Sequence, residues 1–283
     1  MRMPHPMVRG GASMVTASQT TDSPRPCHPP LRHSGLGKKP GVCYIPSAMS
    51  GAKSRVRDNL QRVRDRIAAA CDRAHRSVSD VALVAVTKSA DEQAIAELVA
   101  LGVADLGESR VQQLVARAEW LAARRPAPAV RWHMIGHLQR NKVKPVLEIG
   151  ATIHSVDTLR LAEDIDARAA QRQQVADVMI EINCSGEGQK FGVAPPAGPH
   201  LAEQVSTLRH IRLVGLMTMA ARGDNPEASR RAFARLREMF EEMRQERLGG
   251  RELRHLSMGM SQDFEIAIEE GATLVRIGGA LFE

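Results

Sequence analysis

The chain has 283 residues, of which 43% are hydrophobic and only 3% aromatic, so it can bury a sizeable and mostly aliphatic core. It contains no run of about 18 apolar residues, which excludes a membrane-spanning helix. The formal net charge is +7, but residues 1–48 carry most of it. The remainder is nearly neutral, so nucleic acid is not an expected partner.

Residues 1–48 differ in composition from the rest of the chain. They contain 8 of the 15 prolines and show no hydrophobic period, which predicts a disordered extension. Alternatively, translation begins at Met49 and the extension lies upstream of the true start. Residues 49–283 would then form the folded domain. It begins with a predicted helix, because apolar residues recur at helical spacing at Val56, Leu60, Val63, Ile67 and Cys71.

Strands and helices are predicted to alternate from Val81 onward. Apolar runs predict strands at 81–87, 103–107, 131–136, 151–155, 176–183, 211–217, 254–258 and 273–277. Amphipathic patterns predict helices at about 91–101, 109–124, 139–148, 158–172, 198–208, 226–247 and 261–270. This α/β order predicts a single (β/α)8 barrel of the TIM type, preceded by an N-terminal helix. A doubly wound sheet is the alternative, but no Gly-rich dinucleotide fingerprint follows the first strand.

The four cysteines, Cys27, Cys43, Cys71 and Cys184, are widely spaced along the chain. They form neither a CxxC pair nor a cluster with histidine at zinc spacing, so no metal is predicted. Scattered cysteines of this kind are typical of reduced thiols, which indicates a cytoplasmic protein.

Lys88 directly follows the strand VALVAVT, whose apolar run is typical of a strand buried on both faces. The carboxyl ends of such strands carry the chemistry of α/β barrels. The segment after Lys88 predicts a helix with Ser89 as its N-cap and Gly102 as its stop. Burial would favour a neutral amine, and a neutral lysine forms a Schiff base with an aldehyde. The alternative is a lysine that extends from the strand end into water.

The loops after the last two strands have the composition of an anion site. In HLSMGMSQD (255–263), the hydroxyl of Ser257 and the amides around Gly259 could hold a phosphate, with Ser261 as N-cap of the next helix. RIGG (276–279) ends the eighth strand with glycines that let a ligand approach the backbone. Barrels often bind phosphate in these two loops. An ordinary turn and helix cap is the alternative.

The ends of the third and fifth predicted strands carry weaker candidates for functional residues. Alternation puts His133 within the third strand and His137 beyond its end, so His137 is the better candidate for a site, or else a structural histidine. The Gly-rich loop 183–192 is predicted to be mobile. Its Lys190 is either a secondary aldehyde-reactive or gating residue at the rim of the barrel, or simply a solvated side chain.

Seven segments together resemble the pyridoxal phosphate homeostasis protein family, the single-barrel relatives of the alanine racemase amino-terminal domain. WHMIGHLQRNK and SMGMSQDFEIAI are the longest and most specific of them. They lie in the family's order over about residues 52–283 and are VAVTK (84–88), LGESRVQQ (106–113), WHMIGHLQRNK (132–142), INCSGEGQKFG (182–192), GLMTM (215–219), SMGMSQDFEIAI (257–268) and VRIGG (275–279).

The resemblance implies that pyridoxal 5′-phosphate (PLP) lies at the carboxyl face of the barrel as a Schiff base on Lys88. It also implies phosphate contacts from Ser257 and from the backbone after Arg276, with Arg276 facing the pyridine nitrogen. Ser109 and Gly279 depart from the family pattern, which usually has asparagine and often a hydroxyl residue there. The expected cofactor-binding residues are Lys88, Ser109, His137, Asn183, Met217, Ser257, Met258, Gly259, Ser261, Arg276, Gly278 and Gly279.

The expected function is therefore to bind PLP and to buffer or deliver it, as a monomer, with PLP-dependent apoenzymes as potential partners. Two alternatives stay open: a PLP-dependent enzyme resembling amino-acid racemases, and a cofactor-free barrel resembling class I aldolases. Racemase activity is not expected, because the single tyrosine, Tyr44, lies in the extension and cannot serve as the second acid/base.

Overall fold

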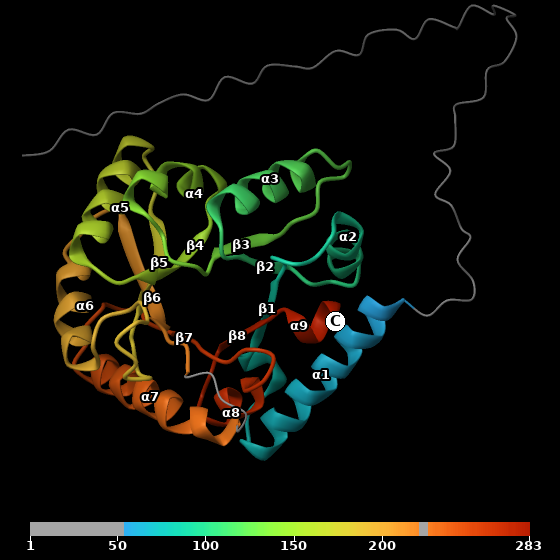
Figure 1. Ribbon diagram of the computed structural model, residues 1–283. Coiled ribbons are helices and arrows are strands. Elements are labelled where there is room, and N and C mark those ends of the chain that lie inside the picture. Colours follow the sequence, from blue (N-terminus) through green and yellow to red (C-terminus); the bar gives the residue numbers. More distant parts are fainter. Residues whose placement is uncertain (1–53, 221–225) are drawn as a thin grey trace, which may run out of the picture. The chain divides into compact units, whose positions relative to one another are not determined.

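The computed structural model describes residues 54–220 and 226–283. Within these residues, eight parallel strands close into a barrel in chain order, with β8 paired to β1, and helices surround the barrel (Figure 1). The predicted α/β barrel is thereby confirmed. Its strands are β1 (Ala82–Val86), β2 (Asp105–Glu108), β3 (Arg131–Met134), β4 (Thr152–Val156), β5 (Ala176–Glu181), β6 (Ile211–Met217), β7 (His255–Ser257) and β8 (Leu274–Ile277).

The predicted helices are also present, although 139–148 and 226–247 each begin with a 3-10 turn, η2 (Arg140–Lys142) and η4 (Pro226–Ser229). Short η1 (Val78–Asp80) and η3 (Pro195–Ala197) were not predicted, nor was α9. The α-helices are α1 (Arg55–Arg73), α2 (Glu92–Ala100), α3 (Val111–Ala122), α4 (Val143–Ile149), α5 (Leu159–Gln171), α6 (Gly198–Ser206), α7 (Arg230–Gln245), α8 (Phe264–Glu269) and α9 (Gly279–Phe282).

Two predicted helix caps are wrong. Asp91, not Ser89, is the N-cap of α2, and its carboxylate accepts a hydrogen bond from the Ala94 amide at 2.8 Å. Ser89 lies instead in a turn that ends before the helix begins. Likewise α8 begins after Asp263, which leaves the Ser261 side chain free to bond elsewhere.

Helix α1 supplies the predicted first apolar face and packs beside α8 and α9 (Figure 1). Its Asn59 side chain is buried and donates to the carbonyl oxygen of Leu281 at 3.1 Å. Arg66 adds a bidentate pair with Glu265 at 2.7 and 2.9 Å. These contacts join the first and the last elements of the domain. Residues 1–48, including Tyr44, lie outside the described part, so the prediction made for them stays a prediction.

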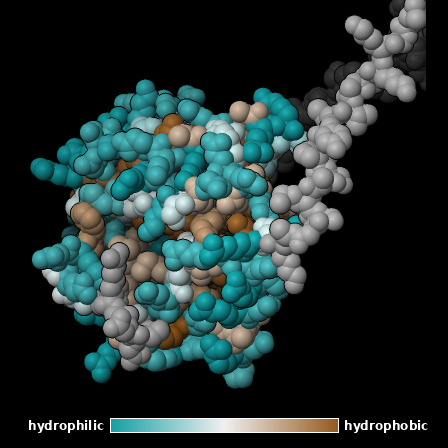
Figure 2. Space-filling view, turned by 45° about the vertical axis from the view of Figure 1, so that its right-hand side comes forward, coloured by the Kyte–Doolittle hydropathy of each residue, from teal (hydrophilic) through white to brown (hydrophobic). Residues whose placement is uncertain are grey.

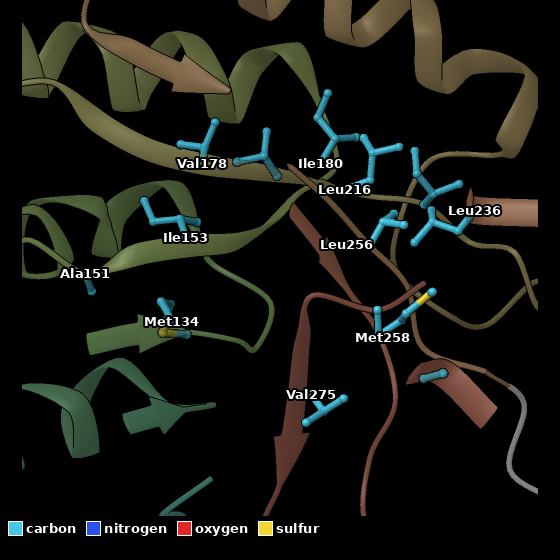
Figure 3. Packing of buried hydrophobic residues seen from close by; sticks show 14 of the residues in the cluster. Met134, Ala151, Ile153, Val178, Ile180, Leu216, Leu236, Leu256, Met258 and Val275 are labelled. Carbon is cyan, nitrogen blue, oxygen red and sulfur yellow. The ribbon is translucent and has the colours of Figure 1, made fainter. Parts of the chain in front are cut away.

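Buried apolar residues form two groups, as the alternation of side chains along a strand requires. The larger one fills the space between strands and helices, and Figure 3 shows part of it, including Met134, Ile153, Val178, Leu216, Leu256 and Met258. The smaller one comprises Val84, Met179, Val214, Met217 and Leu274. Strand register pairs Val84 with Arg276 and Met217 with Ser257, so this second group and these polar residues share the inside of the barrel.

No helix in the described ranges is long and apolar enough to cross a membrane. The face in Figure 2 is mainly hydrophilic, with more hydrophobic residues exposed toward its centre. Among the described residues, the exposed large hydrophobic side chains are Val78, Val175 and Phe191.

Candidate functional site

Lys88 lies in a tight turn between β1 and α2, in which the Ala90 amide donates to the Thr87 carbonyl at 2.9 Å. Thr87 is fully buried, whereas Lys88 is exposed. Of the two environments considered for Lys88, the structure therefore shows the side chain that extends toward water, because burial ends with Thr87 and the turn carries Lys88 out of the barrel wall. The amine is instead accessible to a solute at the carboxyl end of the barrel.

Arg117 of α3 fastens this turn to the barrel. Its guanidinium donates to the Ala90 carbonyl at 2.9 Å and also contacts the Thr87 carbonyl and the Glu108 carboxylate. The Thr87 hydroxyl donates to the same carboxylate oxygen. The other oxygen, Oε2 of Glu108, is buried and has no hydrogen-bond partner in the part of the chain that the structure describes. The carbonyl groups of Thr87 and Ala90, on either side of Lys88 and Ser89, are thus both held by the Arg117 side chain.

The loops after β7 and β8 form a cradle of hydrogen-bond donors. The Ser261 hydroxyl oxygen accepts from the Ala280 amide at 3.3 Å, which joins the two loops. The amides of Gly259, Ser261, Gly278 and Gly279 have no acceptor among the described residues. Several N–H groups that point to no protein acceptor are what a phosphate site provides.

Two glycines shape this cradle. A Cβ on Gly278 would lie 3.0 Å from the carbonyl oxygen of Val86, so the β8 loop packs directly on the end of β1, two residues before Lys88. Gly259 has φ of +89°, and a Cβ there would lie 2.5 Å from that of Ala267. A side chain at either position would displace backbone, which explains the glycines and brings the cradle to the same end of the barrel as Lys88.

Arg276 is a buried cation below the cradle, and only 4% of it is exposed. Its Nη1 donates to the Ser257 hydroxyl oxygen at 2.7 Å and its Nη2 to the Thr218 carbonyl at 3.0 Å. Burial lowers the pKa of Arg276 to about 10, although the charges of Glu181 and Asp263 oppose this shift. The guanidinium therefore stays charged at neutral pH.

A chain of buried polar side chains continues from Ser257 across the inside of the barrel. The Ser257 oxygen lies 2.9 Å from His154 Nδ1, and His154 Nε2 lies 2.9 Å from His133 Nδ1. His133 Nε2 then lies 3.0 Å from Asp105 Oδ1. Asp105 also receives Arg131 at 2.6 and 2.5 Å. Sequence reasoning missed Asp105, His133 and His154 as site residues, although each is a buried polar residue within a strand of the barrel.

His137 lies at the rim, where its ring stacks on Phe191 with centroids 4.0 Å apart and its Nδ1 is 3.6 Å from Asp157 Oδ2. Glu181, also missed by the sequence analysis, ends β5 opposite Met217 and is buried. Desolvation, aided by the charge of Asp157, raises the pKa of Glu181 to about 7, while Arg276 acts in the opposite direction. The rim is thus partly acidic.

The predicted loop 183–192 is organised by its own side chains. The Asn183 carboxamide donates to the Glu187 carbonyl at 2.9 Å and accepts from the Ser185 hydroxyl at 2.9 Å. Lys190 Nζ donates to the Ala220 carbonyl at 3.0 Å and pairs with Glu187 at 3.1 Å. Lys190 is therefore held against the segment that follows β6 and is not simply solvated.

The remaining predicted positions contribute mainly backbone or apolar surface. Met217 belongs to the interior group beside Ser257, whereas the Met258 side chain packs outward among the strands and helices (Figure 3). Ser109 is half-buried and its carbonyl oxygen would lie 2.3 Å from a Cβ on Gly136, so its main chain supports the β3 loop. Gly279 begins α9 beside Glu283.

A closed parallel barrel with a lysine after β1 and donor-rich loops after β7 and β8 defines a known class of α/β barrels. The family model for the alanine racemase N-terminal domain matches residues 58–283. Solved alanine racemases from Clostridium difficile share this fold, with a TM-score of 0.62 at 17% identity for one of them, over 80% of this chain and 55% of that one.

Closer relatives define the family more narrowly. A pyridoxal phosphate homeostasis protein of Aquifex aeolicus is 42% identical over 225 residues, which is 80% of this chain and 96% of that protein. One of Pseudomonas aeruginosa is 40% identical over 81% of this chain and 95% of its own. PipY of Synechococcus elongatus, solved with PLP bound, is 32% identical with a TM-score of 0.67 over 78% of this chain and 100% of that one. This chain belongs to the pyridoxal phosphate homeostasis protein family.

Proposed function

We propose that this chain binds PLP at the carboxyl end of the barrel and buffers or delivers it within the cell. The observation that carries the proposal is the cradle of unbonded amides around Gly259, Ser261 and Gly278, which packs on the end of the strand that precedes Lys88. A phosphate and a reactive aldehyde on one small ligand fit these two neighbouring features. The names of the relatives and the PLP-bound neighbour support the same ligand.

The donor set fits PLP group by group. The amides and the Ser261 hydroxyl match a phosphate, which binds best to several N–H and O–H donors. Arg276 is a fixed cation at the floor of the site and suits the unprotonated pyridine nitrogen as a donor. Bound PLP would supply an aldehyde, and Lys88 would supply the amine that condenses with it.

The proposed site retains all the residues expected from the sequence, with roles that the contacts refine. Lys88 binds the aldehyde, Met217 provides apolar floor, and His137 and Asn183 belong to the rim and its loop. Ser109 and Met258 contribute through their main chains. The phosphate donors would be the amides and hydroxyl of Gly259, Ser261, Gly278 and Gly279. Arg276 would donate to the pyridine nitrogen, and Ser257 holds Arg276 through its hydroxyl oxygen.

Several finer points belong to the same proposal. Residues 49–283 make up the PLP-binding domain, which acts as a monomer in the cytoplasm and hands PLP to apoenzymes. Exposure of Lys88 supports such a carrier, because a partner or water can reach the amine. The two enzyme alternatives remain outcomes of the test below.

The test is reduction of PLP-loaded protein with borohydride, followed by peptide mass spectrometry. We expect a yellow protein whose colour is bleached and one pyridoxyl adduct, on Lys88. Lys88→Ala should lose the adduct, while Lys190→Ala and Lys144→Ala, an exposed lysine of α4, should retain it. An adduct on another lysine in the wild type would contradict the assignment. A colourless protein that fails to take up PLP would favour the aldolase-like alternative.

A second arm tests the phosphate cradle. Ser261→Ala removes one hydroxyl, worth about 0.5–1.5 kcal/mol for a neutral bond and more to a phosphate. We expect it to weaken PLP but leave unphosphorylated pyridoxal nearly unchanged. Exchange of the α-proton of L-alanine in deuterated water, run on the loaded wild type, distinguishes a racemase-like enzyme. Turnover of about 1–10³ per second would overturn the carrier function.

A further inference from the structure

The buried chain from Arg276 to Asp105 has only one consistent arrangement of hydrogens when both histidines are neutral. A guanidinium only donates, so the Ser257 oxygen accepts from Arg276. The single Ser257 hydrogen is then available for His154 Nδ1. Burial holds the pKa of His154 well below its usual value, and the charge of Arg276 acts in the same direction, so this ring is neutral.

Starting from Asp105, at the other end of this row of hydrogen-bonded side chains, leads to the same arrangement of hydrogens. Hydrogen bonds from His133 and Arg131 lower the pKa of Asp105 to about 2 despite its burial, so Asp105 is a carboxylate and only accepts. His133 Nε2 therefore carries the hydrogen and its Nδ1 is bare. His154 Nε2 must then donate to His133 Nδ1, which leaves His154 Nδ1 to accept from Ser257. Both rings are Nε2–H tautomers.

We propose that Asp105, His133 and His154 are positioning residues that hold Arg276, through Ser257, in the orientation in which it meets the bound ring. The inference rests on the proposed function, because that function supplies the ligand. The arrangement of hydrogen bonds between Arg276 and Asp105 does not depend on that function. Among the described residues, Arg276 donates to the Ser257 hydroxyl oxygen and the Thr218 carbonyl oxygen, and neither of these acceptors is a carboxylate. Every hydrogen bond in the row of side chains from Arg276 to Asp105 has its donor on the Arg276 side and its acceptor on the Asp105 side. The aligned dipoles therefore stabilise the buried charge of Arg276.

This arrangement gives Ser257 a role different from that expected from the sequence. Its one hydrogen is engaged with His154, so it does not donate to a phosphate. Ser257→Ala frees Arg276 from its side-chain acceptor and should weaken PLP and pyridoxal equally, by about two- to tenfold. The phosphate-specific loss belongs to Ser261→Ala, which serves as the matched variant. A loss confined to PLP in Ser257→Ala would overturn the proposal.

Asp177 offers a control for Asp105, the last side chain of the hydrogen-bonded row. It forms a bidentate pair with Arg212 at 2.5 and 2.8 Å, as Asp105 does with Arg131, but it bonds no histidine among the described residues. Asp105→Asn and Asp177→Asn each neutralise one such carboxylate. We expect Asp105→Asn to weaken PLP and pyridoxal about two- to tenfold and Asp177→Asn to change neither. Equal effects of the two variants would contradict the inference.

A ligand-free measurement separates this inference from the proposed function. Ring ¹⁵N chemical shifts of the wild-type protein report histidine tautomers, and we expect Nε2–H for both His133 and His154. The Arg276 guanidinium hydrogens should exchange with solvent faster in Asp105→Asn than in Asp177→Asn. A protein that takes up no PLP but shows both signatures would refute the proposed function alone. An Nδ1–H tautomer at either ring would refute the proposed arrangement of hydrogen bonds between Arg276 and Asp105.

Discussion

Glu181 is a buried carboxyl whose protonation bears on the stability of the protein. Its pKa is raised from 4.5 to about 7, mainly by desolvation. The folded state therefore binds this proton more tightly than the unfolded state does. Its contribution to stability is full below about pH 4.5 and is lost as the pH rises through about 7. The upper bound of the loss is about 3.5 kcal/mol, because one pKa unit corresponds to about 1.4 kcal/mol.

Glu181→Gln should therefore be more stable than the wild type at about pH 8 and should show a weaker decline in unfolding free energy from about pH 5 to pH 8. Urea unfolding at several pH values measures both quantities. Glu119→Gln, at an exposed position of α3, is the control and should follow the wild type. A parallel decline in Glu181→Gln and wild type would show that this carboxyl does not titrate in that range.

At the scale of an element, the turn between β1 and α2 depends on Arg117 of α3. This side chain is 15% exposed and neutralises the fully buried Glu108. Arg117→Ala would leave a buried carboxylate whose only side-chain partner among the described residues is the Thr87 hydroxyl, and we expect a loss of about 3–5 kcal/mol. Arg212→Ala breaks an exposed pair with Asp177 and should cost only about 0–1 kcal/mol.

Urea unfolding gives these two losses, and the rate of adduct formation at Lys88 reports on the turn itself. Arg117→Lys keeps the charge but not the forked geometry that reaches two carbonyls and a carboxylate. We expect this variant to recover most of the stability while adduct formation stays slower than in the wild type. If Arg117→Ala reacts at Lys88 as fast as Arg212→Ala does, Arg117 has no part in positioning the turn.

At the scale of the whole molecule, we expect the described barrel to fold without residues 1–48. Its strands close on one another, and α1 joins α9 through the Asn59–Leu281 hydrogen bond. A chain that begins at Met49 should therefore melt at the same temperature as the full-length chain and bind PLP equally well. Calorimetry and PLP titration on both forms test this. A melting temperature lower by several degrees would mean that residues 1–48 contribute to the fold.

Much of this architecture followed from local pattern. Apolar runs predicted all eight strands to within about two residues, because strands buried on both faces are distinctive in sequence. Position at a strand end was enough to single out Lys88, Arg276 and the loops around Ser261. Helix caps were less predictable: Ser89 and Ser261 have capping side chains, but Asp91 and Asp263 precede the helices and compete for the same role.

The sequence by itself determined the barrel, the residues at its strand ends and the family to which it belongs, since periodicity and motif spacing are local properties. Only the tertiary structure decided which of these residues meet. Asp105, His133, His154 and Ser257 come from four different strands, and no local pattern reveals that closing the barrel aligns them. The exposure of Lys88 and the clamp by Arg117 were likewise decided by packing, because both depend on where α3 lies against β1 and β2.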